Sequence, residues 1–307
     1  MYFFIVNPHS CCGRGEKTWE KLEKILQKKA VVYECYLTQK PGDAREFARK
    51  LTESCREPKV IIIVGGDGTL NEVLDGLCLC QAITLGYVPA GSGNDFARSL
   101  RLPLNPYRCM NRILAQKSIR LLDYGVLTVG TKAEHRRFLV SSGLGLDAAV
   151  CQELLKKETR RSIRFLHLEK AAYLVLGLKQ LLSAKPTKGY IILDRVKKIE
   201  FNHIYFISVH IHPFEGGGFQ FAPQADSSDG KLSICVVSHE NKWKLLSILA
   251  SSFIKRKKYR KGIRTYECRE AFLHVEGPMA VHADGESCGI WEDLQAECIE
   301  KKIRMIV

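Results

Sequence analysis

A turn with three glycines is the first feature of the sequence that could do chemistry. Gly65, Gly66 and Gly68 follow the apolar run Val60–Val64 and precede a helical pattern. Glycine has no Cβ, so the backbone of such a turn can lie directly against a ligand, and its amides can bind phosphate. The amino-terminal end of the helix adds unpaired amides and a positive dipole. This order of elements predicts a phosphate site.

Helix capping and packing offer another explanation of the same turn. Thr69 and Glu72 have the T-x-x-E spacing of a capping box, which is found at ordinary helix starts. Glycine turns between a strand and a helix also occur for packing alone. The dinucleotide pattern G-x-G-x-x-G and the P-loop pattern G-x-x-x-x-G-K-[ST] are both missing from the turn. A phosphate site here would therefore belong to another class.

The turn lies within a stretch, from Met1 to about Asp123, in which short apolar runs alternate with helical patterns. Strands separated by helices form right-handed crossovers and a parallel sheet, so we expect an α/β fold. The predicted strands are residues 2–6, 31–37, 60–64 and 83–88, and the predicted helices are residues 16–29, residues 43–55 and a third after Thr69.

Three glycine-containing loops leave these strands at their carboxyl ends. They are Asn7–Gly15, Gly65–Gly68 and Pro89–Gly93. Ligands of parallel sheets gather beyond these strand ends, so one shared site is the economical interpretation. Arg14 suits contact with phosphate, although a plain loop fits the composition almost as well. Ser92 and Asp95 form a second predicted capping box, which would place two helix amino termini around one anion.

From about Tyr124 the pattern changes to short alternating strands, which predicts an antiparallel sandwich or barrel. Helices are expected at about residues 149–184 and 242–254. The basic run Lys255–Lys261 is either a solvated charged face or a contact for anionic lipid headgroups. His210 and His212 are expected to alternate along one strand rather than to bind a metal.

Composition limits the function classes. The 307 residues suffice for about two domains, and the net charge of +14 favours an anionic partner such as a nucleotide, nucleic acid or membrane surface. No nucleic-acid-binding motif accompanies the charge, so no nucleic acid is expected. The 12 cysteines have no zinc spacing and no leader-like segment precedes the first strand, so we expect free thiols and a cytoplasmic protein. No apolar run approaches the roughly 18 residues that span a bilayer.

Seven segments, taken together, resemble the diacylglycerol kinase catalytic family, and in particular its soluble bacterial lipid kinases. Their order is more specific than the GGDGT motif, which NAD kinases also show. Cys11 and Cys12 depart from the family, which commonly has glycine soon after the serine of the first loop, and Ser92 replaces a common threonine. The segments are Asn7–Ser10, Gly65–Val73, Pro89–Arg98, Asp123–Gly125, Gly143–Ala148, Gly216–Leu232 and Asp284–Glu286.

The resemblance implies an α/β nucleotide-binding domain at residues 1–123, similar to those of NAD kinase and phosphofructokinase. A larger β-sandwich domain for the lipid would follow at residues 124–289, with a strand in residues 290–307 returning to the first domain. It also implies ATP and Mg²⁺ as cofactors, a membrane lipid as substrate, and peripheral binding to an anionic membrane surface. Diacylglycerol is the leading substrate. Ceramide, a long-chain base and phosphatidylglycerol stay open, as do an NAD-kinase-like enzyme, a non-catalytic lipid-binding protein and a homodimer.

Roles of single residues are also implied by the resemblance. Asp67 and Asp123 would arrange catalytic magnesium, and Glu286 would accept the proton of the lipid hydroxyl. Asp284-Gly285 and Asp229-Gly230 are otherwise typical of hairpin turns, and Gly216–Gly218 of a bulge. A second, structural magnesium would bind Asp229 and the carbonyls of Asp226 and Lys231. The nucleotide would contact Asn7, Pro8, Ser10, Thr38, Gly65, Gly66, Asp67, Gly68, Thr69, Leu70, Asn71, Ser92 and Asn94.

Overall fold

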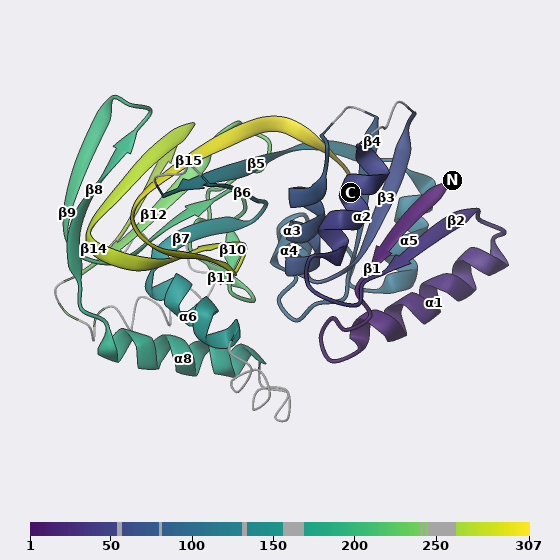
Figure 1. The fold of residues 1–307 in the computed structure, drawn as a ribbon, viewed down its shortest axis with the longest axis horizontal. Coiled ribbons are helices and arrows are strands. Elements are labelled where there is room, and N and C mark those ends of the chain that lie inside the picture. Colours follow the sequence, from purple (N-terminus) through teal and green to yellow (C-terminus); the bar gives the residue numbers. More distant parts are fainter. Residues whose placement is uncertain are drawn as a thin grey trace. The chain divides into compact units, whose positions relative to one another are not determined.

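The computed structural model describes residues 1–53, 57–79, 82–130, 134–155, 169–239, 241, 244 and 262–307. The chain divides into two compact units (Figure 1). Unit 1 comprises Met1–Tyr124 and Glu300–Val307, and unit 2 comprises Gly125–Ile299. The basic run Lys255–Lys261 and most of the predicted helix at 242–254 lie outside the described residues. No helix in the described part of the chain is both long enough and apolar enough to cross a membrane.

Unit 1 contains a parallel sheet, as the alternation of strands and helices predicts. The neighbours are β2, β1, β3 and β4 in that order, and the last residues of β15 add a fifth parallel strand beside β4 through Arg304 and Met305. The returning terminal strand is thereby confirmed. The strands are β1 (Tyr2–Val6), β2 (Tyr33–Leu37), β3 (Lys59–Gly65), β4 (Ile83–Pro89) and β15 (Glu286–Ile306).

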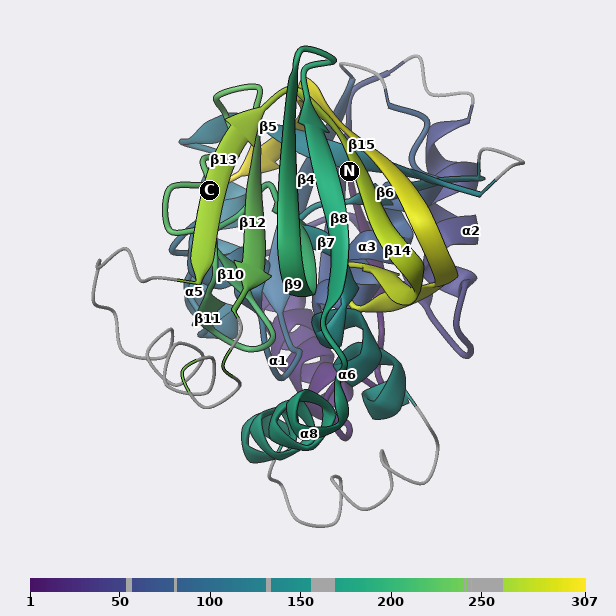
Figure 2. The same ribbon diagram turned by 90° about the vertical axis from the view of Figure 1, so that its left-hand side faces the viewer.

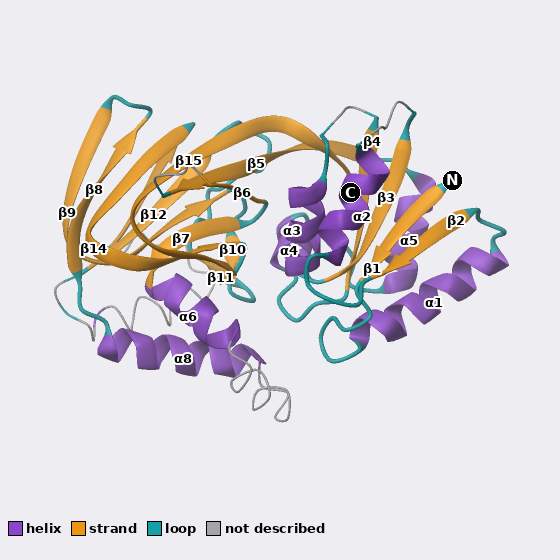
Figure 3. Ribbon diagram, viewed as in Figure 1, coloured by secondary structure: helices purple, strands orange, loops and turns teal. Residues whose placement is uncertain are grey.

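Helices cover both faces of this sheet (Figure 3). Successive residues of a strand point to opposite faces, and both sets are buried in β1 and β3 because each face has a helical layer. Phe4 and Val64 pack with α1 and α5 on one face, and α2 packs beside α3. The helices of this unit are α1 (Arg14–Lys28), α2 (Asp43–Thr52), α3 (Asp67–Gly76), α4 (Asp95–Ser99) and α5 (Pro106–Ala115).

Neither capping box predicted next to the glycine loops forms. α3 begins at Asp67, two residues before Thr69, and no side chain caps it. The Thr69 hydroxyl instead accepts a hydrogen bond from Asn7 Nδ2 at 3.0 Å. α4 follows Asn94 rather than Ser92, again without a capping side chain. Both predictions were wrong: Thr69 connects its loop to the loop after β1, and Ser92 lies two residues before the N-cap position of α4.

Unit 2 is built mainly from antiparallel strands, which confirms the β-rich second half (Figure 2). Its neighbours run β13, β12, β9, β7, β14 and β15, while β8 pairs with both β9 and β14, and β5 pairs with β6 and β15. The strands are β5 (Ile119–Val129), β6 (Glu134–Phe138), β7 (Ser141–Gly145), β8 (Thr187–Leu193), β9 (Lys197–His210), β12 (Leu232–Ser238), β13 (Ile263–Cys268) and β14 (Glu270–Ala283).

Two helices and a short hairpin complete the unit. α6 (Leu146–Leu155) and α8 (Glu169–Ser183) lie in the predicted helical stretch. They pack on a cluster that includes Phe206 and Cys235. The hairpin of β10 (Phe214–Glu215) and β11 (Phe219–Gln220) turns through Gly216, Gly217 and Gly218, all at positive φ. The glycine triplet is therefore a hairpin turn, and the alternative interpretation as a bulge does not hold.

Candidate active site

The three glycine-containing loops of unit 1 are hydrogen-bonded to one another at one edge of the sheet. They follow β1, β3 and β4, so the bonds lie at the carboxyl ends of neighbouring parallel strands. The strands are all parallel, but the order in which they are added reverses here: β2 lies on one side of β1, whereas β3 and β4 lie on the other. Ligands of open α/β sheets bind at such a switch point. The bonds run from Asn7 Nδ2 to Thr69 Oγ1 at 3.0 Å, from the Ala90 amide to the Gly65 carbonyl at 2.7 Å, and from Arg14 Nη1 to the Gly91 carbonyl at 3.1 Å.

Glycines are required where these loops touch. A Cβ on Gly91 would lie 2.6 Å from the Cα of Gly66, closer than two carbon atoms can approach. A Cβ on Gly65 would similarly lie 2.7 Å from the Thr69 side chain. Tyr87, which the sequence did not single out, donates to the Gly65 carbonyl at 3.2 Å. Burial raises the pKa of Tyr87, so its hydroxyl keeps the proton that it donates.

Asp67 lies in the middle of these loops and is partly exposed. Its Oδ2 accepts the Asp95 amide at 2.9 Å and its Oδ1 accepts the Phe96 amide at 3.3 Å. The first amides of α4 therefore bind the Asp67 carboxylate, which corrects the expectation that two helix amino termini face a ligand anion. A carboxylate oxygen can accept more than one interaction, so these hydrogen bonds are compatible with a cation at Asp67.

The predicted nucleotide contacts fall into two groups. Asn7, Pro8, Ser10, Gly66 and Gly68 are partly exposed and Ser92 is exposed, whereas Thr38, Gly65, Thr69, Leu70, Asn71 and Asn94 are buried. The Leu70 side chain is 1% exposed and belongs to the core. Asn94 exchanges two hydrogen bonds of 2.9 Å with the backbone of Gly91 and so shapes the loop from behind. These buried residues could contact a ligand through their backbone amides and carbonyls rather than through their side chains.

Asp123 is completely buried on β5. Its Oδ1 accepts the amide of Lys301 at 2.7 Å, which ties β5 to the end of β15 within unit 1. A buried carboxylate needs such donors, because burial without them costs several kcal/mol. The bond gives Asp123 a structural function; its role at magnesium stays a prediction.

In unit 2 Glu286 is an exposed side chain at the start of β15. Asp284 and Gly285, with φ values of 47° and 84°, form the two-residue turn between β14 and β15. The hairpin predicted for this dipeptide is confirmed. The Asp284 carboxylate also anchors the turn to the start of β7 and the two residues before it. The donating amides are those of Leu139 at 2.7 Å, Val140 at 2.8 Å and Ser141 at 3.0 Å.

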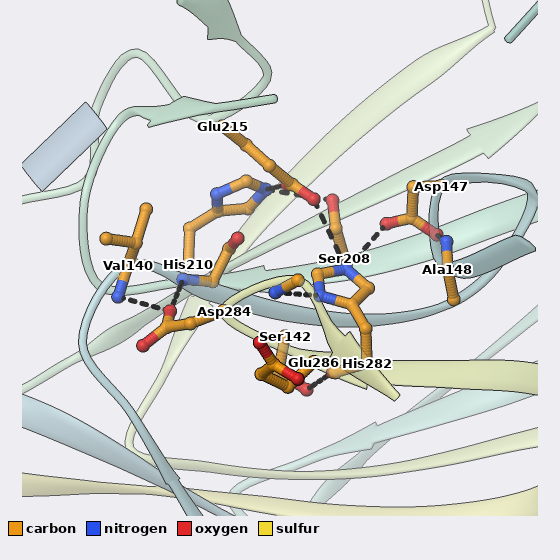
Figure 4. A network of polar contacts seen from close by, with 12 residues as sticks. Val140, Ser142, Asp147, Ala148, Ser208, His210, Glu215, His282, Asp284 and Glu286 are labelled. Carbon is orange, nitrogen blue, oxygen red and sulfur yellow. Dashed lines mark hydrogen bonds and ion pairs between the residues drawn. The ribbon is translucent and has the colours of Figure 1, made fainter. Parts of the chain in front are cut away.

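A buried group of acids and a histidine lies next to this turn (Figure 4). His282 Nε2 is 3.2 Å from Glu215 Oε1 and 3.4 Å from Asp147 Oδ2. Within the described ranges, this is the group of three side chains whose ligand atoms are close enough to hold a metal ion. Burial raises the pKa of Asp147 to about 6. A Cβ on Gly143 would lie 2.6 Å from Asp147 Oδ2, so the glycine makes room for this carboxylate.

The segments that resemble the family include Asp147 and begin just after Glu215 and His282, but none of these three residues had an expected role. His282 stands two positions before Asp284, Glu215 stands directly before the three glycines, and Asp147 belongs to the G-x-G-x-DA segment. The separation of the residues in sequence hid their contact. His210, expected simply to alternate along a strand, is buried at the end of β9 with its Nε2 3.6 Å from Glu215 Oε2.

The residues proposed for a structural magnesium lie in an exposed turn between β11 and β12. Asp229 Oδ1 accepts the Lys231 amide at 3.0 Å, and Asp226 Oδ1 accepts the Ser228 amide at 3.0 Å. Gly230 has φ of 73°, which confirms the turn predicted for Asp229-Gly230. The ten cysteines that the structure describes are all free, as expected.

Comparison with known proteins assigns both halves of the chain. Residues 1–127 match the diacylglycerol kinase catalytic domain, and residues 140–307 match the YegS C-terminal NAD kinase beta sandwich-like domain. The chain is 30% identical to the Bacillus subtilis protein "Putative lipid kinase YtlR", with 94% of each chain covered. It is 27% identical to a B. subtilis diacylglycerol kinase, covering 93% of this chain and 89% of that protein.

Solved structures agree on the fold. A diacylglycerol kinase from Bacillus anthracis str. Sterne superposes with a TM-score of 0.72 at 20% identity, covering 99% of this chain and 96% of that one. An NAD kinase from Archaeoglobus fulgidus in complex with ATP superposes with a TM-score of 0.53 at 14% identity, covering 100% and 94%. The chain belongs to the diacylglycerol kinase catalytic family with a YegS-type second domain, and it is a lipid kinase, a phosphotransferase.

Proposed function

We propose that this lipid kinase transfers the terminal phosphoryl group of ATP, with Mg²⁺, to the hydroxyl of a membrane lipid, and that diacylglycerol is converted to phosphatidic acid. One observation carries the proposal: the three loops of unit 1 meet at the carboxyl ends of β1, β3 and β4, with the partly exposed Asp67 among them. Their backbone can approach a triphosphate closely, because Gly66 and Gly91 have no side chains there.

The residues around the loops fit ATP and magnesium. Asp67 provides a hard oxygen ligand within the phosphate-binding turn, and Arg14 provides a cation at the rim of the same loops. Magnesium bound with ATP would neutralise charge that develops on the phosphoryl oxygens. Asp67 and Asp123 would fix the metal, while Asp229 with the carbonyls of Asp226 and Lys231 would hold a second, structural magnesium.

Glu286 would act as the base. A free alcohol is a poor nucleophile, and a positioned carboxylate can accept its proton as the oxygen attacks phosphorus. Phosphoryl transfer has a loose transition state in which the proton can leave late, so an ordinary carboxylate suffices. Two features of Glu286 support the role: its side chain is exposed to a substrate, and the turn that carries it is anchored by three hydrogen bonds to Asp284.

A surface on α8 supports contact with a membrane. Val175, Leu178 and Leu182 are 62%, 41% and 51% exposed, and their spacing of three and seven residues places them on one helix face. Exposed Lys179 directly follows Leu178, and exposed Lys185 lies three positions after Leu182. Apolar groups flanked by cations are typical of helices that lie in the surface of an anionic bilayer. We therefore propose a cytoplasmic protein that binds the membrane peripherally through α8.

The catalytic roles are tested with labelled ATP and diacylglycerol in mixed micelles. Asp67→Ala and Glu286→Ala should each lower kcat by about 10²- to 10⁴-fold, the usual contribution of such groups. Glu292→Ala, an exposed acid on the same strand as Glu286, should retain activity. Full turnover by both site variants would refute the assigned roles. Incubation with total membrane lipid, followed by mass spectrometry of the product, shows whether diacylglycerol or another lipid is phosphorylated. A parallel assay with NAD in place of lipid tests the NAD-kinase-like alternative.

The membrane contact has its own test. Leu178→Glu with Leu182→Glu should reduce cosedimentation with vesicles that contain phosphatidylglycerol, while activity on a short-chain, water-soluble diacylglycerol stays the same. The paired change Lys188→Glu with Lys197→Glu, at exposed cations outside α8, serves as the control. Binding that is equal in all three proteins would show that α8 does not face the bilayer.

A further inference from the structure

The turn that carries Glu286 is held from a second side, by His282. The amide of Gly285 donates to His282 Nδ1 at 3.2 Å. The opposite ring nitrogen, Nε2, lies between Glu215 Oε1 and Asp147 Oδ2 (Figure 4). His282 is 1% exposed, and its backbone carbonyl accepts the Ser142 hydroxyl at 2.7 Å. The ring thus joins the backbone of the turn to two buried carboxylates.

The hydrogen bonds determine the tautomer of this ring. An N–H aimed at Nδ1 requires a lone pair there, so the ring proton is on Nε2, where it faces the two carboxylates. A metal ion at Nε2 would need the lone pair of that nitrogen and would move the proton to Nδ1, against the Gly285 amide. The group therefore fits a hydrogen-bonded anchor better than a metal centre.

The charges around the ring act against this neutral form. Burial lowers the pKa of His282, but the charges around the ring outweigh burial and raise that pKa well above its usual range. A proton added to the ring would be at Nδ1, where it would face the Gly285 N–H. The contacts of the two ring nitrogens therefore oppose each other: the Gly285 amide favours the neutral ring with an acceptor at Nδ1, and the two carboxylates favour protonation of the ring.

We propose that His282 is a positioning residue for Glu286: Nδ1 fixes the turn that carries the base, and Nε2–H is held in turn by Asp147 and Glu215. The inference rests on the proposed role of Glu286 and adds residues that act through it. Displacement of a reacting group by about 1 Å can cost on the order of a hundredfold in rate. Glu286 is only one residue from Gly285, so loss of the anchor moves the base directly.

Two substitutions separate the two halves of the ring. His282→Asn keeps an acceptor near the position of Nδ1 and loses contact with the carboxylates, whereas His282→Gln keeps a donor near Nε2 and loses the bond to Gly285. The bond to the turn is the one that positions Glu286. We therefore expect kcat to fall by about tenfold in His282→Asn and by about a hundredfold in His282→Gln. The KM for ATP should be unchanged in both.

His274→Gln is the matched control. His274 lies on the same strand and also pairs with a carboxylate, Asp293, at 2.7 Å, but it is partly exposed. Its replacement should leave kcat unchanged. Circular dichroism and the Tm determine the folded fraction to which each rate is normalised. Glu215→Gln, which keeps the side-chain shape, tests the same anchor if the histidine variants do not fold, with an expected fall in kcat of a few-fold.

The decisive measurement is a double-mutant cycle. In a Glu286→Ala background, His282→Gln should change the residual rate by less than about twofold, because the anchor acts only through the missing base. The positioning role would be overturned if the losses of kcat in His282→Gln and Glu286→Ala multiply independently, or if both single histidine variants have wild-type kcat. In either case Glu286 would remain the base. Wild-type activity of Glu286→Ala would instead remove the base itself. If the wild-type protein binds one equivalent of zinc or manganese and Glu215→Gln does not, the group is a metal centre, and the anchor proposal is wrong.

Discussion

The two units build their candidate site residues in opposite ways. In unit 1, backbones touch: Gly91 lies against Gly66, and loop carbonyls and amides bond directly. In unit 2, a buried ring and two carboxylates fix the turn that carries Glu286. Loops that touch at their glycines have little conformational freedom, and they bind a ligand through backbone groups, which every residue has. A network of buried charges depends on each member, since removing one leaves the others unpaired.

A glycine in each unit illustrates the difference. A Cβ on Gly91 would meet the Gly66 Cα at 2.6 Å, and a Cβ on Gly143 would meet Asp147 Oδ2 at the same 2.6 Å. The first neighbour is backbone and cannot move without moving the loop. The second is the end of a side chain, which can rotate away but would then leave His282; the Ile207 carbonyl oxygen, at 2.9 Å from the same Cβ, is backbone. The same residue type thus protects loop geometry in one unit and a buried carboxylate in the other.

Among the substitutions that test this comparison between the units, the largest effect is expected from Gly91→Ala. The added methyl group would push the loop after β4 away from the turn after β3, so the proposed ATP site would open. We expect kcat/KM for ATP to fall by at least about a hundredfold, because positioning of the phosphates is lost. Overpacking should also cost about 1–3 kcal/mol in the free energy of unfolding. Steady-state kinetics and urea unfolding measure the two effects.

Gly177→Ala serves as the control for that substitution. Gly177 lies within α8, and a Cβ there would meet no other atom within 4 Å. Alanine is a better helix former than glycine by about 1 kcal/mol, so the variant should be equally active and slightly more stable. Wild-type ATP kinetics in Gly91→Ala would contradict the view that backbone contact shapes the site.

Asp284→Ala tests the anchored turn of unit 2. The substitution leaves the amides of Leu139, Val140 and Ser141 without their acceptor. Hydrogen bonds to a charged group are worth about 1.5–3 kcal/mol each, although partial exposure reduces the sum, so we expect a loss of about 3 kcal/mol in unfolding free energy. Thermal and urea unfolding provide the measurement.

Asp284→Asn keeps one side-chain oxygen as an acceptor and should lose only about half as much. Equal stability of the alanine variant and the wild type would mean that solvent replaces the carboxylate, and that the turn is not anchored there. Activity should follow the same order as stability, because Glu286 lies two residues beyond Asp284.

Local patterns were sufficient to predict most of unit 1, although α5 and the start of β5 were not among the predicted elements. Its strands are apolar runs buried on both faces, and the parallel pairings follow from the helices between them. The glycine loops were also found, because each is one continuous segment at a strand end. The capping boxes were wrong, since Thr69 bonds to Asn7, 62 positions away, and such a partner is invisible to a local pattern.

The buried group of unit 2 could not be predicted in the same way. Asp147, Glu215 and His282 come from a helix start, a short hairpin and the end of a long strand. Only the antiparallel pairing of β7 with β9 and β14 brings these segments together. A single sequence gives no register for strands so far apart. The family resemblance pointed to Glu286 but not to the residues that hold its turn.

The smallest expected effect is that of His212. This ring is buried, and its substitution tests the effect of burial rather than that of the group around His282. Burial lowers the pKa of His212 from 6.5 to about 3. Below pH 6.5 the unfolded chain therefore binds a proton that the folded chain excludes, so stability falls as the pH falls. Between pH 7.5 and 5.5 this one ring should cost about 1.4 kcal/mol. In His212→Gln the drop in unfolding free energy between these pH values should be smaller by that amount, as measured by urea unfolding. An unchanged drop would mean that His212 takes up its proton in the folded protein, and that water or a carboxylate reaches this part of unit 2.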